Sequence, residues 1–393
     1  MAKPAIRIAG LAAGHGAVDF YIPVIPALLP SLIPLFAEQG ITSYAMTGLL
    51  FTTVTIMMVI FQPLTGLLID KNLWTPSTTL SIILCAVAVG AFGVTQNYWI
   101  LLLFAAILGF ANSAYHPNAY RQIHQFTTND NRGLFMSLMS VGGTFGYGAA
   151  PLATGFLYAW GGFPAVLCLL IPGLLIALIL LKLPQHPLKE TAAEAAEAAT
   201  TKPNYKGAAL MLGISSLRSW VFYGFLAFGV EYLSGYANVE YVLATGVISG
   251  MIFAGMFGTL LIGPLSDKIG RKEVMIISYL GGALGYAGIF LFSGIASVIS
   301  LVVAGFFLMA TASVEIATVQ EMMPGSVGFA SGVVIGIPQG MSALSMVLIG
   351  VIADFFGLPF SLSIQVIFMI AAFAACLALP YPLKLLKRRT LRV

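Results

Sequence analysis

The sequence predicts an all-α membrane protein with twelve transmembrane helices arranged as two pseudo-symmetric bundles of six. The first observation is composition: of 393 residues, 59% are hydrophobic and only 8% are charged, whereas a soluble surface carries about 25% charged residues. The second is that the apolar residues form runs of the roughly 20 residues that a spanning helix needs. The third is a motif that follows the second apolar run and recurs after the eighth. Lipid is therefore expected to be the main solvent of this chain.

Polar and turn residues divide the apolar runs into twelve predicted spans. The first set covers 7–35, 43–69, 77–96, 99–125, 134–159 and 163–183, and the second covers 208–234, 241–265, 274–293, 297–321, 327–352 and 360–382. Between the sets, Pro184 to Lys206 mixes charges at i,i+4 spacing with alanines, which predicts a helical linker at the membrane surface. The predicted domains are an N-terminal bundle over 1–183, a cytosolic linker over 184–206 and a C-terminal bundle over 207–393.

The basic residues predict the orientation of the spans. With both termini in the cytosol, sixteen of the eighteen Lys and Arg residues fall on the cytosolic side or at its boundary. The other two, Arg121 and Arg218, lie inside spans, so no extracytoplasmic loop carries a basic residue. Because cytosolic loops are enriched in Lys and Arg, this distribution predicts cytosolic termini.

The two halves repeat each other in sequence. The segment from Gly66 to Asp70 matches the segment from Gly263 to Asp267, an offset of 197 positions. Parallel repeats of this kind place the substrate site at the repeat interface near the middle of the membrane. The full run Gly263-Pro-Leu-Ser-Asp267-Lys268-Ile-Gly270-Arg271-Lys272 resembles the signature loop of the major facilitator superfamily.

The resemblance implies that this loop is a conformational latch, since its glycines permit close backbone approach and its basic residues anchor the cytosolic face. The predicted latch residues are Gly66, Asp70, Gly263, Asp267, Arg271 and Lys272. The first-half copy continues as Asn72-Leu-Trp-Thr-Pro76 without the Gly-Arg-Lys sequence. A strong latch is therefore expected only in the second half.

Two spans carry helix-breaking or small residues. Span 5 places glycines from Gly142 to Gly155 around Pro151, which predicts a bent helix in close contact with its neighbours. It resembles the glycine-rich fifth-span motif of antiporters in the superfamily, and tight packing without any bearing on transport direction is the alternative. Span 1 is expected to be bent and mobile in its extracytoplasmic half, because it contains four prolines, namely Pro23, Pro26, Pro30 and Pro34.

Ionisable residues inside spans are candidates for function, because a charge at mid-bilayer is costly unless it faces a cavity or a partner. They concentrate on spans 1, 4, 7 and 10, which are the cavity-lining set in the superfamily that the chain resembles. The set consists of His15, Asp19, His116, Arg121, His124, Arg218, Glu231, Glu315 and Glu321.

Four of these residues are predicted to couple transport to protons. His15 and Asp19 lie one helical turn apart, so they can form a hydrogen bond and titrate together near physiological pH. We expect the pair to take up a proton together with His116, with a static interhelical contact as the alternative. Glu315 is expected either to receive a proton or to pair with Arg218.

The two arginines inside spans favour an anionic substrate, because guanidinium binds carboxylate or phosphonate through two hydrogen bonds and stays charged. Arg218 is the deeper one, whereas Arg121 either faces the cavity or reaches the cytosolic surface. Further candidate substrate-binding residues are Tyr115, Asn112, Trp220 and Tyr223. The carboxylates near the ends of spans 10 and 11, Glu321 and Asp354, are candidate gate residues.

Several motifs together resemble a narrower group, the fosmidomycin-resistance-like exporters. They are His15-x-x-x-Asp19, Gln62-Pro63-x-x-Gly66, His116-Pro117-x-x-x-Arg121, Arg132-Gly133-Leu134, Val141-Gly142-Gly143-x-Phe145-Gly146, Gln320-Glu321-x-x-Pro324-Gly325, Gly340-Met341 and Ile352-Ala353-Asp354. The resemblance implies proton-driven export of small acidic or amphipathic compounds across the cytoplasmic membrane of a bacterium.

The sequence thus predicts a proton-coupled exporter that works by alternating access, as a monomer, without a cofactor and without nucleic acid. Uptake or exchange of an organic anion or another metabolite by the same fold is the alternative. A membrane-embedded enzyme or receptor is a remote alternative, because no motif places a Ser or Cys nucleophile beside a buried base. Nor does any spacing along the chain match a metal-ligand cluster, and the three cysteines, Cys85, Cys168 and Cys376, lie far apart within apolar runs.

Overall fold

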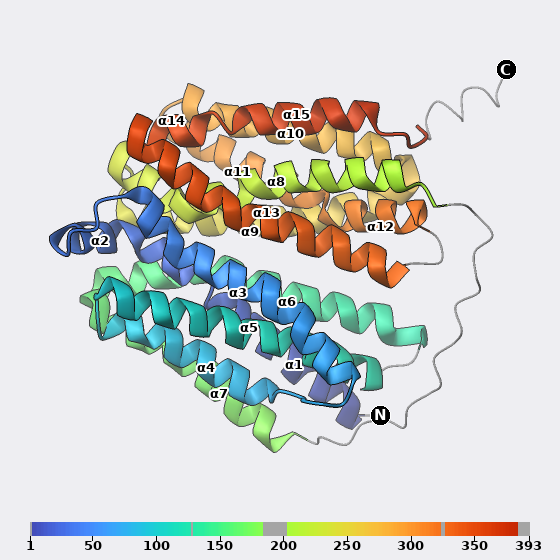
Figure 1. Cartoon of the computed structure of the whole chain (residues 1–393), viewed down its shortest axis with the longest axis horizontal. Coiled ribbons are helices and arrows are strands. Elements are labelled where there is room, and N and C mark those ends of the chain that lie inside the picture. The colour runs from blue at the N-terminus through green and yellow to red at the C-terminus, as the bar shows by residue number, and fades with distance from the viewer. Residues whose placement is uncertain (1, 127–128, 184–202, 324–326, 384–393) are drawn as a thin grey trace. The chain divides into compact units, whose positions relative to one another are not determined.

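The structure is a computed structural model that describes residues 2–126, 129–183, 203–323 and 327–383, and within these ranges every regular element is a helix. Figure 1 shows their arrangement. The first half contains α1 (Ala2–Phe20), α2 (Val24–Glu38), α3 (Tyr44–Asp70), α4 (Thr78–Gly90), η1 (Ala91–Gly93), α5 (Tyr98–Phe126), α6 (Asn129–Val166), η2 (Leu167–Leu169) and α7 (Leu170–Lys182). The second contains α8 (Tyr205–Glu231), η3 (Tyr232–Tyr236), α9 (Tyr241–Ile269), α10 (Arg271–Leu291), α11 (Ile295–Ala310), α12 (Ala312–Met322), α13 (Val327–Phe356), α14 (Leu358–Ser363) and α15 (Val366–Ala378). The predicted all-α class is confirmed.

Polar and glycine residues set several helix boundaries. The Ser43 side chain accepts a hydrogen bond from the Met46 amide at 3.3 Å, and that of Ser77 accepts one from the Leu80 amide at 3.2 Å. Each serine satisfies an amide that the first helical turn leaves without a partner. Gly270, with φ of 125°, separates α9 from α10 in a conformation that L side chains disfavour.

The described segments account for twelve membrane crossings. Ten helical segments are long and apolar enough to span a bilayer, and an eleventh, Thr78–Gly93, is a shorter apolar helix. The longest, Leu138–Lys182, has 45 residues, so as one straight helix it would be about 68 Å long, twice the bilayer core. Non-helical backbone at Gly161 and Gly162 divides it into two crossings. The number of spans predicted from sequence is therefore confirmed.

The first crossing is interrupted where the prolines begin. α1 ends at Phe20 and α2 begins at Val24, directly after Pro23. α2 remains helical through Pro30 and Pro34. The interruption lies just beyond Asp19, at the first of the four prolines, and the expected bend and mobility of the outer half stay predictions.

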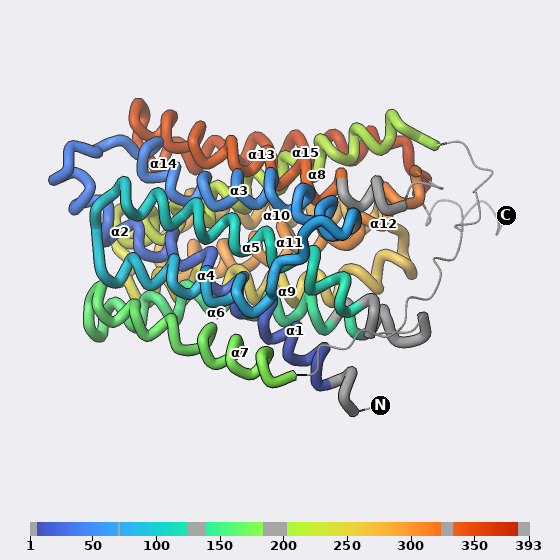
Figure 2. The backbone as a smooth tube through the Cα atoms, turned by 60° about the horizontal axis from the view of Figure 1, so that its bottom comes forward, coloured from blue at the N-terminus to red at the C-terminus, as the bar shows by residue number. Residues whose placement is uncertain are grey.

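The described residues form two compact units. The first unit takes its residues from Met1–Ala192 and Leu226–Ser249, and the second from Ala193–Phe225 and Gly250–Val393. Within the first unit α4 lies between α5 and α7, as both views show, and α1 packs against α6 (Figures 1 and 2). Within the second unit α10 packs against α11 and α15.

The segment Leu226–Ser249 belongs to the first unit through polar contacts as well as packing. The hydroxyls of Tyr44 and Tyr236 lie 2.9 Å apart, and the Tyr241 hydroxyl donates to the Ala27 carbonyl at 2.9 Å. The domain boundaries expected from sequence stay predictions, and most of the expected linker, 184–202, lies outside the described residues.

Glycines in α6 allow its backbone to touch that of α1. A Cβ atom on Gly146 would lie 1.9 Å from the Gly16 carbonyl oxygen, and one on Gly142 would lie 2.4 Å from the Ala12 carbonyl oxygen. No side chain fits at either position, so small residues are required there. The close contact predicted for span 5 is present, and α6 continues as a helix through Pro151.

Candidate functional site

Two histidines and one carboxylate meet inside the first unit. His15 and Asp19 project from α1 one turn apart, and His116 projects from α5. The Asp19 carboxylate lies 3.1 Å from His15 Nε2 and 3.3 Å from His116 Nε2, and the two Nε2 atoms are 3.0 Å apart. We call these three residues the His–Asp cluster. Both histidines are buried, and 18% of the Asp19 side chain is exposed.

Backbone carbonyls determine which histidine nitrogens carry protons. His15 Nδ1 lies 2.7 Å from the Met139 carbonyl oxygen, and His116 Nδ1 lies 2.9 Å from that of Asn112. Because a carbonyl only accepts, each Nδ1 is the protonated nitrogen, and Nε2 of a neutral ring is then an acceptor. Two Nε2 lone pairs and a carboxylate consequently face one another. This arrangement is repulsive unless a proton or another cation lies among them.

Neighbouring residues hold the His–Asp cluster in place. The Asn112 amide donates to Asp19 Oδ1 at 3.3 Å and to the Val18 carbonyl at 3.2 Å. A Cβ atom on Gly143 of α6 would lie 2.6 Å from His15 Cε1 and 2.7 Å from Asp19 Oδ2. Gly143 therefore provides the space that these two side chains occupy.

Tyr115 is fully buried beneath the His–Asp cluster. Its hydroxyl donates to the Leu11 carbonyl at 2.5 Å, and its ring stacks on that of His15 with centroids 6.4 Å apart. Asn112 and Tyr115 thus both contact the cluster, and their expected part in substrate binding stays a prediction.

The second unit contains a buried ion pair. Arg218 of α8 donates to Glu315 of α12 through Nε at 2.7 Å and through Nη2 at 3.1 Å. Tyr279 and Thr311 donate to the same carboxylate at 2.8 Å and 2.6 Å. The Glu315 side chain is 2% exposed and that of Arg218 is 11% exposed. The structure therefore brings together the two residues that the sequence suggested could pair.

The His–Asp cluster and this ion pair occupy nearly corresponding positions in the two halves. Asp19 and Arg218 are 199 positions apart, and so are His116 and Glu315, two more than the offset of 197 between the signature segments. In each half an acid and a base join the first span to the fourth. In the first half the acid, Asp19, lies on the first span, whereas in the second half the acid, Glu315, lies on the fourth. The sequence showed an offset of 197, and only the contacts reveal that these residues correspond at 199.

The other predicted substrate-binding residues are distributed differently. Arg121 donates to the Ile69 carbonyl at 3.0 Å and to Asn72 Oδ1 at 3.4 Å, so its charge lies at the C-terminal end of α3, where a cation is favourable. Trp220 packs against Phe368 with ring centroids 5.3 Å apart, and its buried Nε1 has no hydrogen-bond partner among the residues that the structure describes. The Tyr223 ring lies against Phe222.

The second-half latch forms a cluster with the predicted gate residue Glu321. Arg271 donates to Glu321 at 2.7 Å and pairs with Asp267 at 3.3 Å. Tyr381, which sequence reasoning missed, donates to the same Glu321 carboxylate. Burial raises the pKa of Tyr381 to about 12, so its hydroxyl keeps its proton at neutral pH.

The remaining latch and gate residues have separate surroundings. The Lys272 ammonium donates to the carbonyls of Leu377 and Leu379 at the end of α15. A Cβ on Gly66 would lie 3.9 Å from Pro117, and one on Gly263 would lie 3.2 Å from Ser313. The Asp70 side chain lies outside the described residues, and Asp354 is exposed near the end of α13.

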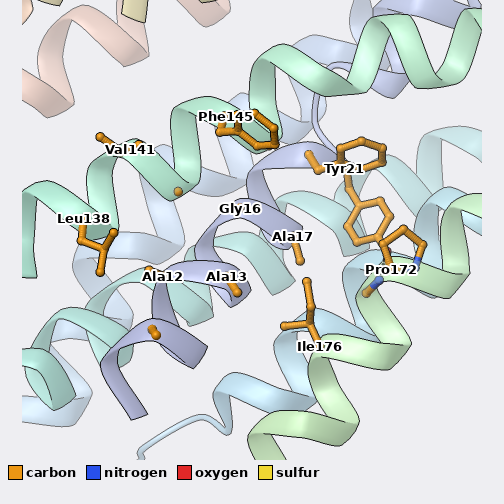
Figure 3. A pocket seen from close by; sticks show the side chains of 15 residues that line it. Ala12, Ala13, Gly16, Ala17, Tyr21, Leu138, Val141, Phe145, Pro172 and Ile176 are labelled. Atoms are coloured by element: carbon orange, nitrogen blue, oxygen red, sulfur yellow. Dashed lines mark hydrogen bonds between the residues drawn. The ribbon is translucent and has the colours of Figure 1, made fainter. Parts of the chain in front are cut away.

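A pocket of about 470 Å³ opens in the first unit between α1, α6 and α7. Figure 3 shows small residues of α1 facing it, with Phe145 of α6 and Pro172 of α7 on other sides. Its lining is apolar and includes none of the predicted binding residues. The pocket is therefore separate from the predicted substrate site.

Twelve crossings, an internal repeat and polar pairs held within the spans define a multi-pass membrane transporter rather than an enzyme. Residues 15–335 match the sequence model of the Major Facilitator Superfamily, and the chain belongs to this family.

Relatives and solved structures agree with this assignment. The chain is 28% identical over 372 residues to the fosmidomycin resistance protein of Escherichia coli (strain K12), covering 91% of this chain and 88% of that one. It is 27% identical over 358 residues to the uncharacterized MFS-type transporter YfnC of Bacillus subtilis (strain 168), covering 85% and 84%.

Among solved structures, a bacterial homolog of the human lysosomal transporter Spinster, in an inward-facing and occupied conformation, aligns with a TM-score of 0.79 at 17% identity over 94% of this chain and 95% of that one. A D-xylose-proton symporter aligns with a TM-score of 0.76 at 16% identity over 96% and 98%. At these identities the two structures support the fold alone.

Proposed function

We propose that the chain is a proton-coupled exporter of small anionic or amphipathic compounds, working by alternating access in the cytoplasmic membrane of a bacterium. Both termini are proposed to be cytosolic, and the protein is proposed to act as a monomer. Similarity to a fosmidomycin resistance protein over 91% of the chain supports export. The placement of basic residues supports the orientation.

The observation that carries proton coupling is the hydrogen-bond pattern of the His–Asp cluster. Both Nδ1 protons are held by backbone carbonyls, so three acceptors converge with atoms 3.0–3.3 Å apart. One proton among them converts this repulsion into hydrogen bonds. The cluster is partly open at Asp19, and it lies beside the interruption of the first crossing. Binding and release of a proton there would change how α1 is held to α5.

The ion pair in the second unit supports a conditional anion site. Glu315 accepts from Nε and Nη2 of Arg218, and the Leu308 carbonyl accepts from Nη1. An anion can therefore bind Arg218 only when Glu315 is displaced or protonated, so anion binding depends on the protonation of Glu315. The glutamine variant Glu315→Gln imitates the protonated acid, so it is expected to bind anionic ligands more tightly than the wild type does. Ligand-induced thermal shifts with fosmidomycin and with acidic metabolites measure this, and Arg218→Met serves as the matched loss-of-charge control.

Transport across a defined pH gradient tests the whole proposal. In inside-out vesicles an exporter accumulates its substrate when the vesicle interior is acidic, because protons then leave as substrate enters. Asp19→Asn is expected to remove this dependence while leaving exchange down a substrate gradient. Accumulation driven by the opposite gradient would instead indicate uptake. Gradient-driven accumulation that survives in Asp19→Asn would refute the role of the His–Asp cluster.

A further inference from the structure

The His–Asp cluster has a second capacity that proton coupling does not require. We propose that His15, Asp19 and His116 form a binding site for a divalent transition-metal ion of the Zn²⁺ class. Their ligand atoms all lie within 4.8 Å of one another, and the group is interior rather than on the surface. The proposal rests on ligand geometry and is separate from the proposed transport function.

The ligand atoms have the spacing that such an ion needs. Tetrahedral Zn²⁺ binds nitrogen and oxygen at about 2.0–2.1 Å, which sets neighbouring ligand atoms about 3.3 Å apart. The two Nε2 atoms are 3.0 Å apart, Asp19 Oδ2 lies 3.1 Å from His15 Nε2, and Asp19 Oδ1 lies 3.3 Å from His116 Nε2. The carboxylate therefore presents one oxygen to each imidazole at a spacing close to that of zinc ligands. Two imidazoles with one carboxylate suit Zn²⁺, Co²⁺ or Ni²⁺, whereas Mg²⁺ and Ca²⁺ prefer ligand sets made of oxygen.

The surrounding hydrogen bonds already orient the ligands for a metal. Metal-binding histidines usually donate their other ring nitrogen to a carbonyl or carboxylate, which fixes the tautomer. His15 does so to the Met139 carbonyl and His116 to the Asn112 carbonyl, which leaves both Nε2 lone pairs available to a metal ion. The Asn112 amide additionally holds Asp19 Oδ1. No reorganisation of tautomers is therefore needed on binding.

The fourth coordination position is free for water or a small anion. Three protein ligands plus one open position is the arrangement of zinc sites that exchange a ligand. The partly exposed Asp19 provides the access route to the cluster. If the cluster also carries the coupling proton, as proposed above, an ion bound there excludes that proton and stops transport.

Calorimetric titration of the purified full-length protein with ZnCl₂ tests the site directly, using a purification tag without histidine. The wild type is expected to bind one Zn²⁺ saturably. His15→Ala, His116→Ala and Asp19→Asn are each expected to weaken binding by roughly 10–100-fold or more. The chain's two other histidines supply the controls, and His124→Ala and His186→Ala are expected to bind as the wild type does. His116→Cys replaces one ligand by another and is expected to retain binding.

Thermal unfolding without metal shows whether each variant is folded. Absence of saturable Zn²⁺ binding to the folded wild type overturns the proposal, and so does binding that persists when His15 and His116 are both replaced by alanine. X-ray absorption of the bound complex is expected to show two imidazoles in the zinc shell. Binding without inhibition of vesicle transport would leave the metal site standing and contradict the proton role of the cluster, so the two failures are distinguishable.

Discussion

The Arg218 guanidinium holds both carboxylate oxygens of Glu315, at 2.7 Å and 3.1 Å, in the interior of the second unit. The fixed positive charge that the sequence suggested for an anionic substrate is therefore neutralised by a neighbour. The corresponding acid of the first half, Asp19, instead faces the Nε2 atoms of two histidines. The second half therefore pairs its acid with a guanidinium, and the first half pairs its acid with two imidazoles.

Removing one partner of the ion pair is expected to destabilise the protein more than removing both. Arg218→Met leaves the Glu315 carboxylate buried without its cation, at a cost of about 3–5 kcal/mol. Arg218→Met combined with Glu315→Leu removes both charges and is expected to recover most of that loss. Unfolding of the detergent-solubilised variants measures the difference. A double variant as unstable as the sum of the single variants would contradict a direct pair.

His15→Gln separates hydrogen bonding from proton exchange. A glutamine amide can donate to Asp19 whether or not a proton is bound, but it does not titrate, so the variant is expected to fold and to lose pH-gradient-driven transport. Vesicle flux with and without a pH gradient measures this. Met139 supplies a check, because its carbonyl accepts from His15 Nδ1 and loses that donor in the variant, which predicts a modest loss of about 1 kcal/mol in stability. Retention of the full gradient dependence would exclude His15 from the proton path.

The contact between α1 and α6 predicts a severe effect of a small substitution. Gly146→Ala places a methyl group against the Gly16 carbonyl oxygen, where a Cβ would lie 1.9 Å away. The helices must separate, which is expected to cost about 1–3 kcal/mol. Gly213 in α8 is the matched control, because no atom of the described part of the chain lies within 4 Å of its Cβ position. Gly213→Ala is expected to be neutral or to stabilise by up to about 1 kcal/mol. Equal unfolding midpoints for the two variants would contradict close backbone packing.

The Tyr381–Glu321 contact predicts a pH-dependent contribution to stability. Burial raises the pKa of Tyr381 to about 12, so the hydroxyl remains a donor below the ordinary tyrosine pKa of about 10 and loses its proton as the pH rises through about 12. Tyr381→Phe is therefore expected to lower the free energy of unfolding by about 1 kcal/mol. This difference from the wild type is expected to be constant from neutral pH to about pH 10 and to shrink above it.

Unfolding measured across this pH range tests the expectation. Tyr205→Phe serves as the control, because the Tyr205 side chain is 65% exposed. A stability difference between Tyr381→Phe and the wild type that has disappeared by about pH 9 would contradict the raised pKa.

Most of the fold was predictable from sequence because lipid imposes a simple rule: spans must be long, apolar and helical. The twelve predicted spans follow from that rule. The turn at Gly161 and Gly162 lies between the predicted spans 134–159 and 163–183, because two successive glycines mark a turn even within an apolar run. The interruption of the first crossing between Phe20 and Val24 was not predicted as such, since the four prolines indicated only a bend in its outer half.

The candidate site was predictable only in part. His15 and Asp19 share a helix, so their contact followed from i,i+4 spacing. His116 lies 101 positions from His15, and no local pattern indicates that their Nε2 atoms meet or that a metal-ligand geometry results. Tyr381 likewise joins Glu321 across 60 positions.

By itself the sequence determined that the chain crosses a membrane twelve times and which few residues carry charge inside it, since both follow from composition and periodicity along the chain. Only the tertiary structure decided which of those residues meet. Arg121 caps a helix and Arg218 binds Glu315, although both are arginines within apolar spans. The physical reason is that the role of a buried charged side chain depends on the group that it contacts, and that group belongs to another helix.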